Sequence, residues 1–251
     1  MSPCSLNHAA LLVVTFVSVA KGLIKYNSVL LSKPEHYYFE EELTAKGIIP
    51  EVVPRAPFRI VYLEYLNKNH SVLPGAKFMV GRPDGPVAKE PYNVTWGANA
   101  TDMYTLCLFD FDAPVRAAPV LRSYIHWLVG NIPGAGVKNG ETFFEYFPLR
   151  ARADTGTHRY VMLIWRQPKI LEFKEPYRNG TDEDDRVDFS INEFEKKYQL
   201  EPPIALTYFE CEYDHTIKNP HLRYDDEEVK RKNEELRKNA KPYDDLTEWV
   251  G

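Results

Sequence analysis

Five short runs of β-branched and aromatic residues constrain the fold of this chain more than any other feature of its 251 residues. Pro, Gly or Asn residues that favour turns lie beside each run, which is the pattern of strands joined by tight connections. Three of the runs are apolar at successive positions, as is typical of strands buried on both faces. The pattern predicts a mainly β domain, and 16 tyrosines and 19 prolines fit that class better than a helical bundle. The expected strands are residues 58–66, 104–109, 124–131, 158–165 and 204–213.

Two helices are expected outside these strands. Over residues 188–198, Ser190 lies three residues before Glu193, which is the spacing of a capping box. In the charged tail, acidic residues precede basic ones at i,i+4 spacing, which favours a solvated helix. Its apolar residues recur every seven positions and form a narrow seam that fits docking onto this domain better than onto a second chain. We expect one domain over residues 21–219 and a charged helical extension over residues 220–251.

The amino-terminal residues indicate a cellular location. Residues 9–20 are apolar but too few to cross a bilayer, which needs about 20 residues. Because Ser18 and Ala20 occupy the −3 and −1 positions of a cleavage site, residues 1–20 are interpreted as a signal peptide. An uncleaved anchor or a buried segment stays the alternative, since no Lys or Arg precedes Lys21. A mitochondrial location is the second alternative, disfavoured because no arginine precedes residue 55.

Four N-glycosylation sequons support the secreted location. The composition of the chain gives about one by chance, although turn-rich sequences concentrate Asn, Ser and Thr anyway. Asn179 is expected to be the best acceptor because Asn-Gly in a polar loop is exposed. Asn93, in contrast, falls inside a strand-like segment. The chain is therefore expected to be a secreted glycoprotein. The acceptors are Asn69, Asn93, Asn99 and Asn179.

Charge and cysteine usage exclude several classes of protein. The net charge is −5 and no basic stripe occurs, which argues against nucleic acid as a partner. Cys4 lies within the signal-like segment, which leaves Cys107 and Cys211 as two buried thiols or one disulfide. Sequence motifs for zinc, serine hydrolases and phosphate-binding loops are not found, so neither a metal nor a cofactor is expected.

Three pairs of polar residues interrupt the apolar strands. Buried polar groups are costly unless they are paired or used, so these pairs are candidates for a site. The members of each pair are two positions apart, so in an extended chain they project from one face of a strand. If the strands are neighbours, the pairs can converge at one opening; the alternative is that the backbone satisfies each one separately. The pairs are Asp110 with Asp112, Tyr124 with His126, and His158 with Tyr160.

These residues carry a family resemblance. The run YTLCLFDFDAPVRAAPVLRSYIHWLVGNIPG, followed by TGTHRYVMLIWRQP and FSINEFEKKYQL, resembles the phosphatidylethanolamine-binding protein family, which includes the Raf kinase inhibitor proteins. The family pattern Asp-Pro-Asp-Ala-Pro is matched at 110–114 and the Gly-x-His-Arg block at 156–160. The resemblance covers residues 38–214 and implies a single mainly β domain. In that fold a central, largely antiparallel sheet packs on a smaller sheet, with helices at the periphery and towards the carboxyl terminus.

The resemblance also implies a ligand site. In the family, a small pocket at one end of the domain accepts phosphoryl headgroups, phosphorylated peptides and small anions. Imidazole N–H groups and a tyrosine hydroxyl can donate to phosphate oxygens, and a carboxylate can orient an imidazole or accept from an ethanolamine ammonium. Carried over by position, the pocket residues are Asp110, Asp112, Ala113, Pro114, Tyr124, His126, Gly156, His158 and Tyr160.

Several positions depart from the family pattern. Phe111 replaces a proline, Ile125 replaces the second histidine of a His-His pair, and Leu121 replaces a tyrosine. The Gly-x-Gly-Pro-Pro stretch that lines the family pocket is replaced by Pro-Leu-Arg-Ala-Arg-Ala-Asp at residues 148–154. Two outcomes are open for this wall. Its arginines point inward and strengthen anion binding, which makes Arg152 a further candidate ligand-binding residue, or its larger side chains fill the pocket.

The sequence as a whole predicts a divergent, secreted, non-enzymatic binding protein, expected to be a monomer. It would carry a lipid or other small ligand with an anionic headgroup, or modulate a protease or kinase as a protein partner. The alternative is a structural or interaction subunit with a degenerate pocket, as in the family-like mitochondrial ribosomal protein of the large subunit. Binding of phosphoethanolamine separates the two.

Overall fold

A computed structural model describes residues 29–65, 70–81, 85, 87–183 and 185–216. The expected signal peptide, Cys4, Asn69 and the expected helix of the tail lie outside the described residues. No helix in the described ranges has the length and apolar character needed to cross a membrane.

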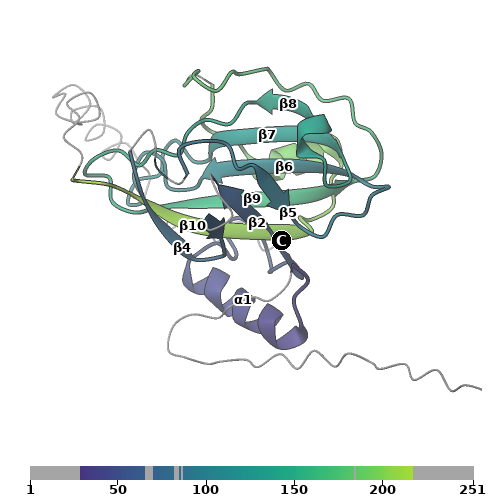
Figure 1. The fold of residues 1–251 in the computed structure, drawn as a ribbon, viewed down its shortest axis with the longest axis horizontal. Helices are drawn as coiled ribbons and strands as arrows, with labels where there is room; N and C mark the ends of the chain where they lie inside the picture. The colour runs from purple at the N-terminus through teal and green to yellow at the C-terminus, as the bar shows by residue number, and fades with distance from the viewer. Residues whose placement is uncertain (1–28, 66–69, 82–84, 86, 184, 217–251) are drawn as a thin grey trace, which may run out of the picture.

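A seven-stranded sheet forms the centre of the domain (Figure 1). Its strands follow the order β1-β10-β9-β6-β7-β8, and β4 also pairs with β10. The strands from β10 to β8 are antiparallel, whereas β1 and β4 run parallel to β10. The bounds are β1 Arg59–Ile60, β4 Ala76–Val80, β6 Met103–Asp110, β7 Tyr124–Pro133, β8 Glu141–Phe144, β9 His158–Gln167 and β10 Ala205–Tyr213.

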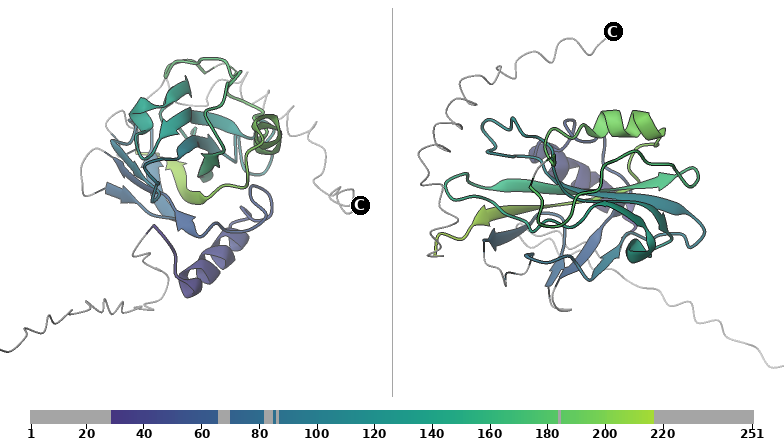
Figure 2. Two further views of the ribbon diagram at one scale, coloured as in Figure 1. Left: turned by 90° about the vertical axis from the view of Figure 1, so that its right-hand side faces the viewer. Right: turned by 90° about the horizontal axis from the view of Figure 1, so that it is seen from above.

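A second, three-stranded antiparallel sheet packs on one face of the large sheet, and two helices contribute to the core on its other face. Figure 2 shows the small sheet and α2 on opposite sides of the large sheet. This arrangement confirms the expected mainly β fold with two packed sheets and peripheral helices. The remaining elements are β2 Tyr62–Tyr65, β3 His70–Val72, β5 Asn93–Thr95, α1 Lys33–Ala45, α2 Ile191–Tyr198 and the 3-10 helix Val137–Asn139.

The central strands are buried on both faces, as their unbroken apolar runs predicted. In β6, Leu106 and Leu108 belong to the core under the small sheet, while Cys107 and Phe109 belong to the core under the helices. Cys211 lies in the first of these cores, so β9 and the thickness of the sheet separate the two thiols. Both cysteines are free, which settles the question of a disulfide, and burial raises the pKa of each thiol.

The two described helices differ in how well the sequence predicted them. Helix α2 begins after Ser190, whose hydroxyl accepts a hydrogen bond from the Glu193 backbone at 3.2 Å, as expected. The complete capping box occurs instead at α1, where Ser32 and Glu35 bond to each other's backbone N–H groups. The sequence analysis missed α1 because only Phe39 and Leu43 of this helix are buried, which leaves a very narrow apolar stripe.

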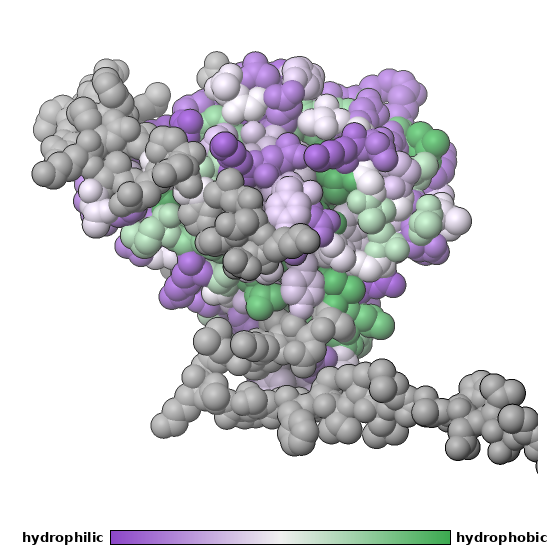
Figure 3. Space-filling model, in the orientation of Figure 1, coloured by the Kyte–Doolittle hydropathy of each residue, from purple (hydrophilic) through white to green (hydrophobic). Residues whose placement is uncertain are grey.

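On the face of the molecule seen in Figure 1, hydrophilic and apolar residues gather in different areas. Figure 3 shows hydrophilic residues over β7 and β8, and apolar residues lower down, between the small sheet and α1. The charged residues therefore surround the edge of the large sheet that carries β7 and β8.

Candidate functional site

The candidate polar residues meet at one end of three adjacent strands. Asp110 is the last residue of β6 and lies opposite Tyr124 on β7 and Tyr160 on β9. His158 is the first residue of β9. Because β6 lies between β7 and β9, its terminal carboxylate lies between the histidine-bearing strands. The antiparallel order thus brings together residues that are up to about 50 positions apart in sequence, from Asp110 to Tyr160.

A β-bulge places His126 in this cluster. Phe109 pairs with Ile125 and Leu108 pairs with Trp127, so His126 is the extra residue of β7. The imidazole lies edge-on to the ring of Tyr160, with 5.1 Å between ring centroids, and 5.2 Å from the ring of Tyr124. Tyr124, His126 and Tyr160 therefore form one aromatic group beside Asp110.

His158 is held as an imidazolium. Its Nδ1 lies 2.7 Å from Asp110 Oδ2 and its Nε2 lies 2.9 Å from Thr155 Oγ1. The Thr155 hydroxyl donates to the carbonyl of Arg152, so its oxygen accepts from Nε2–H, and both ring nitrogens of His158 carry protons. Burial alone lowers the pKa of His158, but the charge and hydrogen bond of Asp110 outweigh it and leave this pKa raised.

His126 has the opposite charge preference. Its Nδ1 lies 2.9 Å from the carbonyl oxygen of Phe147, which can only accept, so Nδ1 carries the proton. Burial of the imidazole lowers the pKa of His126 to about 4, although the hydrogen bond to Phe147 and the charge of Asp110 act against this change. His126 is therefore neutral where His158 is charged.

Tyr160 has a buried hydroxyl with no hydrogen-bond partner among the described residues. The phenol ring is fully buried and stacks on Phe209 at a centroid distance of 5.7 Å. Burial, followed by the charge of Asp110, raises the pKa of Tyr160 well above its usual value. The backbone of Arg150 lies beside the hydroxyl without forming a hydrogen bond of normal geometry. The neutral phenol is a donor that the protein leaves unused.

The expectation that Asp110 and Asp112 share one strand face is wrong. Strand β6 ends at Asp110, whose Oδ1 accepts from the backbone N–H of Asp112 at 2.8 Å, and the chain turns there. Asp112 is fully buried and pairs with Arg159, with its oxygens 2.6 Å from Nη2 and 2.8 Å from Nε. The buried Ala113 and the partly buried Pro114 continue the same turn. Asp112 is thus engaged by Arg159, whereas Asp110 is engaged by His158.

Phe111, which replaces the family proline, is held between two arginines. The guanidinium carbons of Arg122 and Arg159 lie 3.7 Å and 4.8 Å from the centroid of its ring. Arg159 also donates to the carbonyls of Lys46 and Gly47, just after α1. This departure from the family pattern therefore has a structural role, because it helps to tie the end of α1 to the turn that follows β6.

The altered wall alternates between buried and exposed residues. Leu149, Ala151 and Ala153 are buried in the core under the small sheet. Arg150 and Arg152 point outward instead, where they pair with Glu183 at 3.1 Å and 3.8 Å. The outcome with inward-pointing arginines, including Arg152, is therefore wrong for this structure, because alternate residues of an extended segment face opposite sides and here the apolar ones face the core.

The segment over residues 147–155 closes the cluster. Its Phe147 carbonyl accepts from His126, the Arg150 backbone lies beside the Tyr160 hydroxyl, and Thr155 accepts from His158. Gly156 adopts φ +76°, a conformation that favours glycine, and turns the chain into β9. As a result, Asp110, His126, His158 and Tyr160 are each no more than 3% exposed.

Arg186 is a site-bordering residue that the sequence analysis missed. Its guanidinium is fully buried, and burial lowers the pKa of Arg186. It lies 5.0 Å from the ring centroid of Phe147 and its charge helps to lower the pKa of His126. A lone arginine in a polar loop carries no sequence signal of burial. It donates to the carbonyls of Ile125, Glu145, Asn179 and Asp182.

Within the described ranges, no three His, Cys, Asp or Glu side chains are grouped so that they could hold a metal ion. The cluster therefore consists of one ion pair between Asp110 and His158, a neutral imidazole and an unused phenol. These groups can donate hydrogen bonds to an anion.

The fold and the cluster place the chain in a family. A family model described as phosphatidylethanolamine-binding protein matches residues 68–209, which is more than half of the chain. The chain therefore belongs to the phosphatidylethanolamine-binding protein family, as its motifs indicated. Binding is the property for which the family is named.

Two curated relatives are similar over about two thirds of the chain. The "Putative odorant-binding protein A5" of Drosophila melanogaster is 29% identical over 171 residues, which cover 68% of this chain and 78% of the relative. The "26 kDa secreted antigen" of Toxocara canis is 34% identical over 167 residues. That match covers 66% of this chain and 61% of the antigen, less than two thirds of the antigen's length.

Solved structures share the fold. A phosphatidylethanolamine-binding protein from Plasmodium vivax has a TM-score of 0.58 at 21% identity, over 69% of this chain and 97% of its own. The carboxypeptidase Y inhibitor, solved in complex with its cognate proteinase, has a TM-score of 0.57 at 18% identity, over 69% of this chain and 94% of its own. At these identities the likeness shows the fold alone.

Proposed function

We propose that this chain is a non-enzymatic binding protein that takes a small anionic group, such as a phosphoryl headgroup, at the cluster of Asp110, His126, His158 and Tyr160. The observation that carries the proposal is the buried Tyr160 hydroxyl without a partner. A buried polar group in that condition costs about 1–3 kcal/mol, which a ligand oxygen would recover by accepting its hydrogen bond.

Binding requires the segment over residues 147–155 to open. Opening frees the Nδ1–H of His126 from Phe147 and the Nε2–H of His158 from Thr155. Together with the hydroxyl of Tyr160, these form three donors for the oxygens of one phosphoryl group. The His158 imidazolium adds charge, and Asp110 keeps it oriented. The contacts that hold the segment closed are thus the contacts that the ligand would replace.

Substitution of Tyr160 by Phe tests the proposal. Isothermal titration with phosphoethanolamine, and separately with inorganic phosphate, should show an affinity lower by about 5- to 100-fold in Tyr160→Phe, since one donor to the anion is lost. The stability of the unliganded variant should stay equal or rise, because the removed hydroxyl has no partner.

Thr207→Val is the matched control. Its hydroxyl is also buried and without a partner among the described residues, but Thr207 pairs with Met162 of β9, away from the strand end that carries the cluster. This variant should bind like the unchanged protein. Undetectable binding by the unchanged protein at millimolar ligand, at both mildly acidic and neutral pH, would reject the anion site.

The packed wall favours a second candidate function. Leu149, Ala151 and Ala153 are packed into the core, and the segment that carries them covers the cluster. A chain with a permanently filled pocket would act through its surface, as an interaction subunit or as a modulator of a protease or kinase. A negative titration with phosphoethanolamine, combined with a folded and stable protein, would leave this candidate in place of the first.

We also propose that the protein is secreted and glycosylated, with residues 1–20 as its signal peptide. A relative is named a secreted antigen. Three of the four sequon asparagines lie in the described ranges and are exposed, at Asn93 in β5, Asn99 and Asn179. In the sequon at Asn179, the hydroxyl of Thr181 donates to Asn179 Oδ1 at 2.7 Å.

A further inference from the structure

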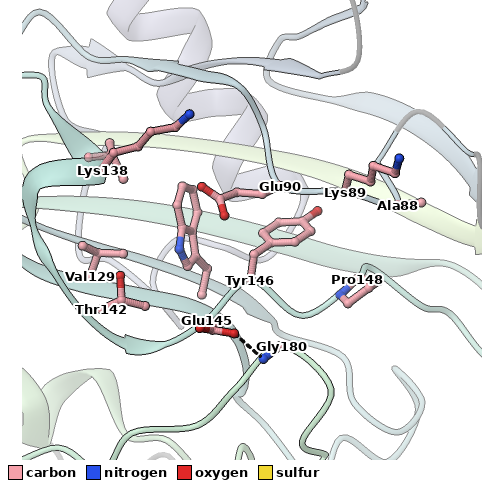
Figure 4. Close-up of a pocket in the computed structure, with 12 residues that line it drawn as sticks. Ala88, Lys89, Glu90, Val129, Lys138, Thr142, Glu145, Tyr146, Pro148 and Gly180 are labelled. Carbon is pink, nitrogen blue, oxygen red and sulfur yellow. Dashed lines mark hydrogen bonds between the residues drawn. The ribbon is translucent and has the colours of Figure 1, made fainter.

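A cavity of about 490 Å³ opens beside the candidate site but is lined by other residues (Figure 4). It lies between the residues that precede β5, the 3-10 helix Val137–Asn139 and the edge of the large sheet formed by β7 and β8. Its volume is in the range of cavities that hold small organic ligands. The lining residues that matter most are Lys89, Glu90, Trp127, Lys138, Glu145 and Tyr146.

Two aromatic rings give the cavity a fixed apolar wall. Trp127 and Tyr146 are both buried and meet edge to face, with 5.9 Å between ring centroids. The hydroxyl of Tyr146 donates to the carbonyl of Val87 at 2.9 Å, which fixes the orientation of its ring. Val129 and Val137 extend the apolar lining. An apolar group of a ligand can therefore pack against a rigid surface.

Charged groups without partners surround this wall. The side chains of Lys89, Glu90 and Lys138 make no hydrogen bond and no ion pair with any residue in the described part of the chain. Glu145 differs, because it accepts from the hydroxyl of Tyr177 at 2.5 Å and from the backbone of Gly180 at 2.9 Å. Lys89, Glu90 and Lys138 are exposed, so the cavity offers one carboxylate and two ammonium groups at its rim that a ligand can reach.

Neighbouring charges act on the exposed carboxylate of Glu90. Partial burial raises the pKa of Glu90, the charge of Lys138 lowers it, and the charge of Glu145 raises it again. Glu90 therefore lies within electrostatic reach of both neighbours, and Figure 4 shows its carboxylate between Lys138 and Tyr146. A cationic group of a ligand would pair with Glu90 and offset the repulsion from Glu145.

We propose that this cavity binds a free α-amino acid with a large apolar side chain. The ligand's ammonium pairs with Glu90, its carboxylate pairs with Lys138 or Lys89, and its side chain packs against Trp127 and Tyr146. A simple anion would meet repulsion from Glu90 and Glu145, and a simple cation would meet repulsion from the two lysines. An uncharged apolar molecule would desolvate three charges without pairing them. A zwitterion with an apolar group avoids all three problems, because it pairs with charges of both signs and packs against the aromatic wall.

Isothermal titration with L-phenylalanine and its two capped forms tests the proposal. Phenylalaninamide keeps the ammonium and lacks the carboxylate, whereas N-acetyl-phenylalanine keeps the carboxylate and lacks the ammonium. Each cap should weaken binding about tenfold, since a charged hydrogen bond is lost. In Glu90→Gln, L-phenylalanine should no longer bind more tightly than N-acetyl-phenylalanine. In Lys138→Met, it should no longer bind more tightly than phenylalaninamide.

The controls separate this site from the anion site. Glu201→Gln and Lys196→Met change the same charges at exposed positions around α2 and should leave the affinity for L-phenylalanine unchanged. Tyr160→Phe should also leave it unchanged, even if binding of phosphoethanolamine is lost or never observed. The proposal would be overturned if millimolar L-phenylalanine showed no saturable binding, or if the capped forms bound as tightly as L-phenylalanine. It would also be overturned if Tyr160→Phe lost this binding while Glu90→Gln and Lys138→Met kept it.

Discussion

At the scale of single residues, two histidines with similar burial hold different protonation states. His158 faces the carboxylate of Asp110 at 2.7 Å, whereas the polar contact of His126 is the neutral carbonyl of Phe147. A carboxylate compensates the cost of burying an imidazolium, and a carbonyl does so only weakly. The partner of each ring therefore decides its charge, and the spacing of the residues in sequence does not reveal that partner.

This difference predicts two separate titrations. In NMR spectra, the His158 ring should titrate above its ordinary pKa of about 6.5 and that of His126 near the value of about 4. Since a raised folded-state pKa favours the charged form, the stability due to His158 is present below about pH 6.5 and is lost as pH rises through its folded pKa. The stability due to neutral His126 is lost as pH falls from about 6.5 towards 4.

The pH dependence of anion binding should follow the titration of His158. Affinity for phosphoethanolamine should fall as pH rises through the pKa of His158, because a neutral ring attracts phosphate less strongly. His126 should add no pH dependence near neutrality. Two histidines that both titrate near 6.5 would contradict the assigned partners.

At the scale of elements, strand ends and one bulge assemble the cluster. Strands β6, β7 and β9 are neighbours, and the bulge in β7 adds His126 to their shared end. The segment over residues 147–155 then covers that end with alternate residues, of which Leu149 faces the core and Arg152 faces solvent. The alternation of apolar and charged residues therefore decides which side chains of this segment face the core and which face solvent.

Two substitutions in this segment should therefore have opposite consequences. Leu149→Ala should lower the free energy of unfolding by about 2–4 kcal/mol, since it leaves a cavity in the core. Arg152→Ala should change that energy by less than about 1 kcal/mol, because its ion pair with Glu183 is exposed, and should leave the affinity for phosphoethanolamine unchanged. Chemical denaturation measures the free energy of unfolding of each variant, and isothermal titration measures its affinity for phosphoethanolamine. An affinity that drops in Arg152→Ala would mean that this arginine reaches the ligand when the segment opens.

At the scale of the whole molecule, the described strands of the large sheet all end before the tail begins. Strand β10 ends at Tyr213 and lies between β9 on one side and β1 and β4 on the other. Among the described residues, every pairing of β10 with β1, β4 and β9 lies within residues 205–213 of this strand.

Removal of residues 220–251 should therefore leave the domain folded. The shortened protein should be soluble, with a circular dichroism spectrum of a β protein and a thermal midpoint within a few degrees of the full chain. An insoluble or unfolded product would show that the apolar seam of the tail belongs to the core, and that the expected boundary is wrong.

The proposed secretion also concerns the whole chain. Expression in a eukaryotic cell should yield a product in the medium that begins near Lys21 and loses mass on deglycosylation. Asn179→Gln should remove one glycan, because Asn179 is exposed in a loop. Retention of Met1 in a cytosolic product, with no change of mass after deglycosylation, would reject the proposal.

The sequence by itself determined the class of fold and the location of the cluster. Unbroken apolar runs require strands buried on both faces, and Ser190 three residues before Glu193 marks the start of α2. Polar residues such as Asp110 and His158 stand out because they interrupt buried strands. These features depend on local periodicity, which a single sequence contains.

Only the tertiary structure decided which partner each polar residue has. Asp112 pairs with Arg159 because the chain turns after β6. Arg186 is buried because four carbonyls converge on it, two of them from the distant residues Ile125 and Glu145. The wall at residues 148–154 is packed because its alternate residues face the core. Such pairings depend on the path of the chain between strands and on contacts between segments far apart in sequence. Local patterns constrain neither of them, so the protonation states and the closure of the site could not be predicted from the residues alone.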